Sequence, residues 1–183
     1  MENQAEPRWL DAEEQQNWYA LAYALIRLPA ALDAQMQHDA GLSHFEYLVM
    51  SGLSMMPSRT QRMSDLAVIT ASTLSRLSNV VTRLEKRGWM SRTPDPSDGR
   101  YTLAILTEDG WAKVTASAPA YVSEVRRLVL DPLTKAQQQQ MGHIAQRILK
   151  AIDPGTPRIE DCFPTAAAPL SGEQEPTSQI ILA

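Results

Sequence analysis

The 183-residue sequence has little of several features that mark other protein classes. Cys162 is its single cysteine, which excludes an intramolecular disulfide and any metal site built from several thiolates. With 8 glycines and 2 phenylalanines, the chain has too few turn and strand residues for an all-β sandwich. No apolar run approaches the roughly 18 residues of a membrane span, and the acidic N-terminus lacks the pattern of a signal peptide. We therefore expect a mainly α-helical, cytoplasmic protein.

Signals of catalysis and of metal or cofactor binding are also missing. His38, His44 and His143 lie in separate predicted helices, without the spacing of a ligand pair. Neither a glycine-rich phosphate loop nor a Gly-x-Ser-x-Gly motif occurs. The sequence therefore predicts a protein that is not an enzyme and that has no cofactor and no metal site.

The chain does contain a basic segment between acidic flanks. Residues 59–100 carry eight basic and four acidic side chains, a local charge of +4; since the whole chain carries −4, the remainder carries −8. The basic residues are Arg59, Arg62, Arg76, Arg83, Lys86, Arg87, Arg92 and Arg100. A basic centre can attract a polyanion even when the net charge is negative. A solvated surface with uneven charge is the alternative interpretation.

Helical spacing dominates both ends of the chain. Apolar residues three and four apart predict a helix over residues 11 to about 38. Ser43 and Glu46 form a capping box for a second helix, which Pro57 stops. Near the other end, Thr107 caps a helix that Pro132 ends, and Thr134 caps a last helix that reaches residue 152.

The middle of the chain predicts a helix-turn-helix followed by a hairpin. A short helix capped by Ser64 and a break at residues 70–72 precede a helix over 72–87. The apolar positions of this helix are Leu74, Leu77, Val81 and Leu84. Strands around residues 89–93 and 101–105 flank a turn-rich loop, which is typical of a β-hairpin.

The helix over residues 72–87 has an unusual polar face. Opposite the apolar positions it presents Ser72, Ser75, Arg76, Ser78, Asn79, Thr82 and Arg83. A solvated face usually mixes Glu with Lys, and four Ser and Thr residues lower the helix propensity. Short hydroxyls permit close approach to DNA, while Asn and Arg can each bond a base edge in two places. We interpret this face as a DNA-reading surface; a plain solvated face is the alternative.

The hairpin loop offers a second DNA contact. Arg100 follows Asp98 by two residues, so the carboxylate can pair with the guanidinium and fix its direction. An arginine at a hairpin tip can enter a narrow minor groove. Alternatively, the pair only stabilises the turn.

This order of elements resembles the winged-helix transcription regulators of the MarR family. The resemblance spans about residues 10–153 and rests on four groups of residues. They are Leu66-Ala67, residues 74–89 (LSRLSNVVTRLEKRGW), the wing residues Arg92, Asp95 and Asp98-Gly99-Arg100, and residues 106–110 (LTEDG). The chain departs from the family at Asn79, where Arg is common, and at Gly99, where many members have a basic residue.

The resemblance implies a mainly α fold with a small β-hairpin wing. A winged helix-turn-helix lobe (residues 41–107) would lie between dimerisation helices (residues 1–40 and 108–153), followed by a proline-rich tail (residues 154–183). It further implies a homodimer that binds pseudo-palindromic double-stranded DNA, commonly as a repressor.

Many such repressors are released by a small aromatic ligand, for which Trp18, Tyr47 and Trp111 are candidates here. Ordinary core or dimer contacts are the favoured interpretation of these residues, because aromatic side chains at helical spacing fill cores more often than they bind ligands. A thiol switch is not expected, because Cys162 lies in the tail. Two other classes stay open, namely a winged-helix protein-interaction module and a small-molecule-binding protein. Salt-dependent retention on DNA separates the first of these from a DNA-binding regulator.

Overall fold

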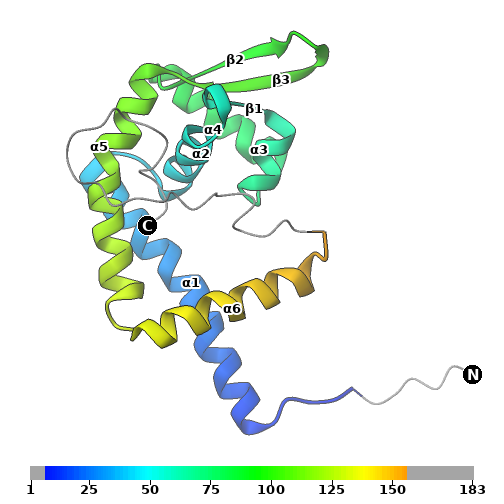
Figure 1. Ribbon diagram of the computed structural model, residues 1–183, viewed down its shortest axis with the longest axis vertical. Coiled ribbons are helices and arrows are strands. Elements are labelled where there is room, and N and C mark those ends of the chain that lie inside the picture. Colours follow the sequence, from blue (N-terminus) through cyan, green and yellow to red (C-terminus); the bar gives the residue numbers. More distant parts are fainter. Residues whose placement is uncertain (1–6, 156–183) are drawn as a thin grey trace, which may run out of the picture.

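Six helices and a three-stranded antiparallel sheet build the fold of residues 7–155, the part of the chain that the computed structural model describes (Figure 1). The helices are α1 (Ala12–Ala40), α2 (His44–Ser54), α3 (Met63–Ile69), α4 (Leu74–Lys86), α5 (Glu108–Val125) and α6 (Lys135–Ile152). The strands are β1 (Thr60–Arg62), β2 (Met90–Asp95) and β3 (Asp98–Leu106). A 3-10 turn, Pro57–Arg59, precedes β1, and a π-helical turn, Arg126–Leu130, follows α5. The predicted mainly α fold with a hairpin wing is confirmed.

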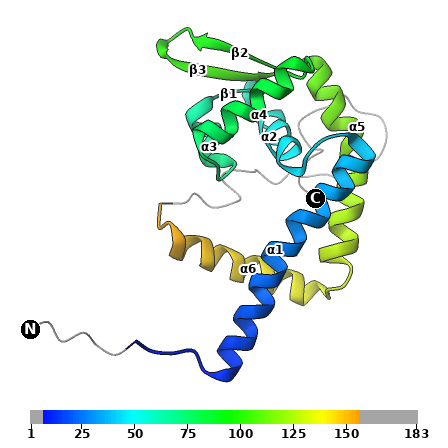
Figure 2. The same cartoon turned by 180° about the vertical axis from the view of Figure 1, so that it is seen from behind.

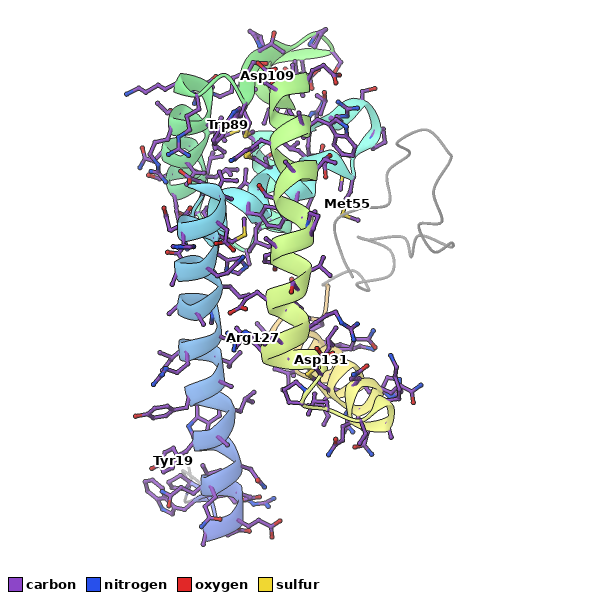
Figure 3. The ribbon with its side chains drawn as sticks, turned by 90° about the vertical axis from the view of Figure 1, so that its left-hand side faces the viewer. Tyr19, Met55, Trp89, Asp109, Arg127 and Asp131 are labelled. Atoms are coloured by element: carbon purple, nitrogen blue, oxygen red, sulfur yellow. The ribbon has the colours of Figure 1, made fainter. Side chains whose placement is uncertain are left out.

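Helix α1 forms a long arm that reaches the core only with its C-terminal part, from Leu28 onward. Its first turn is fixed by a capping box between Asp11 and Glu14, and Gly41 ends it in the left-handed conformation, with φ of 61°. Leu32 and Met36 are its buried residues. Figure 3 shows α1 beside α5 and antiparallel to it, with Tyr19 at the end remote from the rest of the molecule. Most of α1 therefore extends beyond the globular part of the chain.

The globular part is a lobe in which α2, α3 and α4 pack under the sheet. The capping box of Ser43 and Glu46 starts α2 as predicted. Fully buried side chains from α1, α2, α3, α4 and α5 meet in one core. The largest of them are Tyr47, Met36, Leu42, Met50, Leu53, Leu66, Leu77 and Leu84. This lobe thus buries its own apolar surface within a single chain.

The sheet has the order β1-β3-β2, and its two long strands form the wing. Thr60 pairs with Ile105, and Met90 pairs with Leu106. The hairpin of β2 and β3 projects beyond the helices in both Figure 1 and Figure 2. Both strands run longer than predicted, so that the loop shrinks to two residues. Strand β1 was not predicted, because three residues paired with a distant strand show no alternation of their own.

Three details of the helix-turn-helix differ from the sequence prediction. Ser64 does not cap α3; Arg62 occupies the N-cap position without a side-chain bond, and Ser64 donates to Asp65 instead. Helix α4 starts after Thr73, whose hydroxyl accepts from the Arg76 amide, so Ser72 lies in the preceding turn. Leu74 is 53 % exposed rather than buried.

The fourth buried residue of α4 is Val80, which was not among the predicted apolar positions. Leu77, Val81 and Leu84 are buried as predicted. Leu74 is the first residue of α4, and at this end of the helix its side chain stays exposed to solvent.

A tight corner joins the wing to α5. Thr107 caps α5 as predicted, accepting from the Gly110 amide, and its hydroxyl donates to the Gly88 carbonyl at 2.7 Å. A Cβ on Gly110 would lie 2.0 Å from the Trp89 carbonyl oxygen. The backbone at Gly110 therefore lies so close to the backbone at Trp89 that only glycine fits at position 110 without a shift of the chain.

Helix α6 leaves the lobe after the π-helical turn. Thr134 and Gln137 form the predicted capping box, and no residue of α6 is buried. Figure 3 shows α6 turning away from α5 beside Asp131 and standing apart from α1. No helix in residues 7–155 combines the length and the apolar character that crossing a bilayer requires. Cys162 and residues 156–183 of the predicted tail lie outside the described residues.

Candidate nucleic-acid interface

The outer face of α4 centres on Ser75 and Asn79, which lie one turn apart and are both exposed. Thr73 caps this helix, and Gly88, at φ of 74°, reverses the chain into β2. Arg76 and Arg83 border this centre on one side, while Ser78 and Thr82 border it on the other. The two borders have different partners.

One border of α4 is attached to the first turn of α2. The guanidinium of Arg76 lies 4.1 Å from the centroid of the Phe45 ring, within the range of a cation–π contact. The Nε of Arg83 donates to Oε1 of the buried Glu46 at 3.1 Å. The other carboxylate oxygen of Glu46 accepts from the Ser43 amide in the capping box. Helix α2 therefore supports both arginines of α4.

The pKa of Glu46 reflects these contacts. Burial alone would raise this pKa, but the hydrogen bonds from Ser43 and Arg83 and the charges of Arg87 and Arg83 hold it below the ordinary value of a glutamate. The carboxylate therefore stays ionised, and its charge offsets that of Arg83.

The other border of α4 is attached to the wing. Arg92 of β2 donates to the Ser78 hydroxyl at 3.3 Å and to the Thr82 hydroxyl at 3.0 Å, and it forms an ion pair with Glu85. Ser78 and Thr82 are consequently half-buried rather than open to solvent. Of the predicted hydroxyl face, Ser75 thus keeps an exposed hydroxyl on α4, whereas Ser72 bonds to Thr70 in the turn.

The wing is stiffened by two aspartates. Asp95 is buried and accepts from both the amide and the hydroxyl of Ser97, and from the Nε of Arg62 at 2.8 Å. The hydrogen bonds from Ser97, followed by those from Arg62, outweigh burial and lower the pKa of Asp95 to about 2. The base of the hairpin turn is therefore held by an ionised carboxylate.

Asp98 pairs with Arg100 as the sequence predicted. The guanidinium donates two bonds to the carboxylate, at 2.9 Å and 2.6 Å, which lowers the pKa of Asp98 and raises the pKa of Arg100. The Arg100 side chain is nevertheless 84 % exposed at the tip of the wing. Its direction is thus set by Asp98 while it stays accessible to a partner.

The basic side chains of residues 59–100 differ in how far they are neutralised. Within residues 7–155, six of the eight have a carboxylate within 4.0 Å, and the two that have none are Arg76 and Lys86. The six pairs are Arg59–Glu108, Arg62–Asp95, Arg83–Glu46, Arg87–Glu46, Arg92–Glu85 and Arg100–Asp98. The sequence showed the excess of positive charge but not its distribution, because most of these partners lie far apart along the chain.

The three aromatic residues predicted as ligand contacts occupy separate places in one chain. Tyr47 is fully buried, its ring centroid 4.5 Å from that of Tyr121. Trp111 is half-buried at the start of α5, with the guanidinium of Arg59 above its ring. Trp18 is exposed and precedes Tyr19 on the remote end of α1 (Figure 3). In residues 7–155, no three His, Cys, Asp or Glu side chains form a metal-binding cluster.

The sequence and the fold of this chain are similar to those of known proteins. The MarR family model matches residues 42–102, which run from just before α2 into β3. The structure of Sco3205, a MarR family transcriptional regulator from Streptomyces coelicolor solved in complex with DNA, shares 43 % identity and a TM-score of 0.79, covering 82 % of this chain and 94 % of that one. AbsC, a MarR family regulator from the same organism, shares 31 % identity and a TM-score of 0.76, covering 81 % and 99 %.

A relative known by its sequence gives a similar result over a shorter region. The uncharacterised HTH-type transcriptional regulator YdcH of Bacillus subtilis is 32 % identical over 80 residues, which is 43 % of this chain and 54 % of that protein. The matches to Sco3205 and AbsC, in contrast, extend along nearly the whole of those chains. On this basis the present chain belongs to the MarR family, whose members are transcriptional regulators and not enzymes.

Proposed function

We propose that this regulator acts as a homodimeric repressor that binds pseudo-palindromic double-stranded DNA. Helix α4 of each copy enters the major groove with Ser75, Arg76 and Asn79, and Arg100 enters the adjacent minor groove. The observation that carries this proposal is the exposed Arg76 beside Ser75 and Asn79 on the first two turns of α4, with no carboxylate within 4.0 Å of Arg76 among residues 7–155. Base contacts in helix-turn-helix proteins come from this N-terminal part of the reading helix.

The other predicted contact residues have supporting roles in this proposal. Ser72, which bonds to Thr70 in the turn before α4, would contact a phosphate. Ser78, Thr82 and Arg83 attach α4 to β2 and α2, and Asp98 directs Arg100. DNA as the partner is further supported by Sco3205, which was solved in complex with DNA.

The homodimer is supported by apolar surface on α1 and α6. Within one chain, large apolar side chains of both helices are exposed; they include Trp18, Tyr19, Leu25 and Ile26 on α1 and Met141, Ile144, Ile148 and Ile152 on α6. Large exposed apolar side chains gathered on a helix in this way usually mark an interface. We assign residues 1–40 and 108–153 to dimerisation and residues 41–107 to DNA binding.

Release of DNA by a small aromatic ligand is supported by a hollow beside Trp111. The hollow has a volume of about 800 Å³, within the range of small-molecule sites. Met55, Met56, Ile105 and Trp111 supply apolar walls, and the ion pair between Arg59 and Glu108 supplies polar groups. Of the three predicted aromatic contacts, we therefore favour Trp111 as the residue that meets such a ligand.

The test is selection of duplexes from a random pool by the purified protein, followed by titration against salt. Two α4 helices should select half-sites about 10 base pairs, or a multiple of a helical turn, apart. If two lobes neutralise roughly 6–10 phosphates, affinity should fall by about three to five decades between 50 and 200 mM salt. Retention that does not respond to salt, or selection of no sequence, would contradict the proposal.

A further inference from the structure

We propose that the ring of Phe45 positions the guanidinium of Arg76 for base recognition, so that a residue of α2 determines part of the sequence preference of α4. This inference rests on the proposed DNA-binding function. It adds a positioning residue that does not itself lie on the DNA-reading helix.

The contact between the two side chains leaves the donors of Arg76 free. A cation–π contact uses the flat face of the guanidinium, whereas an ion pair uses its N–H edge. Arg83 and Arg100 already bond a carboxylate through that edge, which occupies donors and offsets charge. Arg76, which has no carboxylate within 4.0 Å among residues 7–155, keeps both its charge and the fork geometry that matches a guanine edge.

The ring itself is held firmly. Phe45 is the second residue of α2 and packs against the core of the lobe. The turn that carries it is fixed by the Ser43–Glu46 capping box and by a bond of 2.8 Å from the His44 amide to the Asp33 carboxylate of α1. The fixed ring restricts the rotamers of Arg76 before DNA binds. The conformational entropy that this long side chain loses on binding is therefore smaller.

The surroundings connect this pair to the rest of the reading face. Phe45 and Arg76 border the same hollow as Thr73, Ser75 and Asn79, with a volume of about 550 Å³. The ring therefore lies at the edge of the surface that we propose to meet DNA. From this edge, we expect the guanidinium to reach a base next to the one proposed for Asn79.

The test compares Phe45→Leu with Phe45→Tyr in the full-length protein. Leucine keeps an apolar side chain against the core but has no π face, whereas tyrosine keeps the ring. The readout is the ratio of affinities for the duplex that the wild type selects and for a scrambled duplex of equal length. We expect Phe45→Leu to lower this ratio about fivefold, since a cation–π contact changes an equilibrium constant by roughly two- to thirtyfold.

Two further results are expected if the ring acts through Arg76. Phe45→Tyr should keep the wild-type ratio, and Phe45→Leu should have no additional effect in a chain that already carries Arg76→Ala. In NMR spectra of the free protein, the Arg76 Cδ protons should be shifted upfield by the ring in the wild type and in Phe45→Tyr but not in Phe45→Leu.

Other results would overturn the inference. An equal loss of affinity for both duplexes, or an undiminished effect of Phe45→Leu in the Arg76→Ala background, would assign Phe45 to packing alone. Absence of the upfield shift in the wild type would show that the Arg76 guanidinium does not stack on the Phe45 ring in solution. If Arg76 stacks on Phe45 in the wild-type protein but the protein selects no duplex, the proposed DNA-binding function itself would be refuted.

Discussion

The lobe and the two helical arms that extend from it, α1 and α6, differ in where they place their apolar side chains. In the lobe, Leu77, Val81 and Leu84 of α4 are fully buried. In the arms, α6 has no buried residue and α1 buries only Leu32 and Met36. The lobe closes its core within one chain, whereas the apolar stripes of the arms face outward. Amphipathic spacing alone thus predicts a helix with a packed face but does not say which molecule covers that face.

The largest expected effect concerns an apolar residue of an arm. Ile144→Asp on α6 should leave the lobe folded, because Ile144 is exposed within one chain, yet it should place a charge in the proposed interface. We expect a monomer at micromolar concentration in sedimentation and an affinity for the selected duplex that falls by at least about 100-fold, since the two reading helices are no longer linked.

The matched control is Gln139→Asp, which adds the same charge to an exposed residue outside the apolar stripe of α6. It should remain a dimer. A wild type that sediments as a monomer, or a dimeric Ile144→Asp variant, would show that the interface has been misplaced.

A smaller effect is expected at the reading face of the lobe. Arg76→Ala and Asn79→Ala should each lose about 1–3 kcal/mol on the selected duplex and relax the preference at one base position. Binding isotherms with single-base variants of the duplex measure both quantities. Wild-type affinity in both variants would mean that another face of the lobe contacts DNA.

The wing should contribute affinity rather than discrimination. Arg100→Ala removes an exposed guanidinium at the tip and should weaken binding by a similar factor on selected and scrambled duplexes. It should also flatten the dependence of affinity on salt by about one unit of slope per lost phosphate contact. A loss confined to A-tract duplexes would assign Arg100 to reading groove width instead.

A pH dependence is expected from the buried aspartate of the wing. The pKa of Asp95 is about 2 in the folded chain, below the ordinary value of 3.8, so its contribution is complete above about pH 4 and is lost as the pH falls through 2. Asp95→Asn should therefore lower the thermal midpoint at neutral pH, with the difference shrinking between pH 4 and pH 2. Circular dichroism melts across this range provide the measurement, and a constant difference would argue against the assignment.

The smallest effect is expected for truncation after Asp153. The sequence beyond this point is rich in proline and has no apolar periodicity, so its removal should leave dimerisation and DNA affinity nearly unchanged. Sedimentation and the duplex titration described above measure both. A marked loss of either would place part of an interface in residues 154–183.

Much of the fold could be predicted because its signals are local. Capping residues such as Ser43, Thr107 and Thr134 mark helix starts within four residues of sequence, and all three are confirmed. The pairing of Asp98 with Arg100 is confirmed for the same reason. The exceptions are positions at element ends, such as Leu74 and Ser72, where one turn of difference in the helix start moves a side chain out of the core or off the helix.

The arrangement of the candidate site could be predicted only in part, because it depends on pairs that are distant in sequence. Glu46 precedes Arg83 by 37 residues, and Arg92 reaches back to Ser78 across the turn that ends α4. Neither separation corresponds to a helical or strand period, so the sequence contains no sign of these contacts. It therefore predicted that all seven residues of the polar face are exposed. The structure divides it into an exposed centre and two attached borders.

The contact between Gly110 and the Trp89 carbonyl also bears on how this chain can diverge. Any side chain at position 110 would collide with the backbone of Trp89, whatever DNA the protein binds, and moving that backbone would cost stability. Asn79 is under no such restriction, because it is exposed and only a partner restricts its identity. Glycine at 110 should therefore persist as descendants of this chain drift apart, while a change at 79 would accompany the move to a new set of regulated promoters.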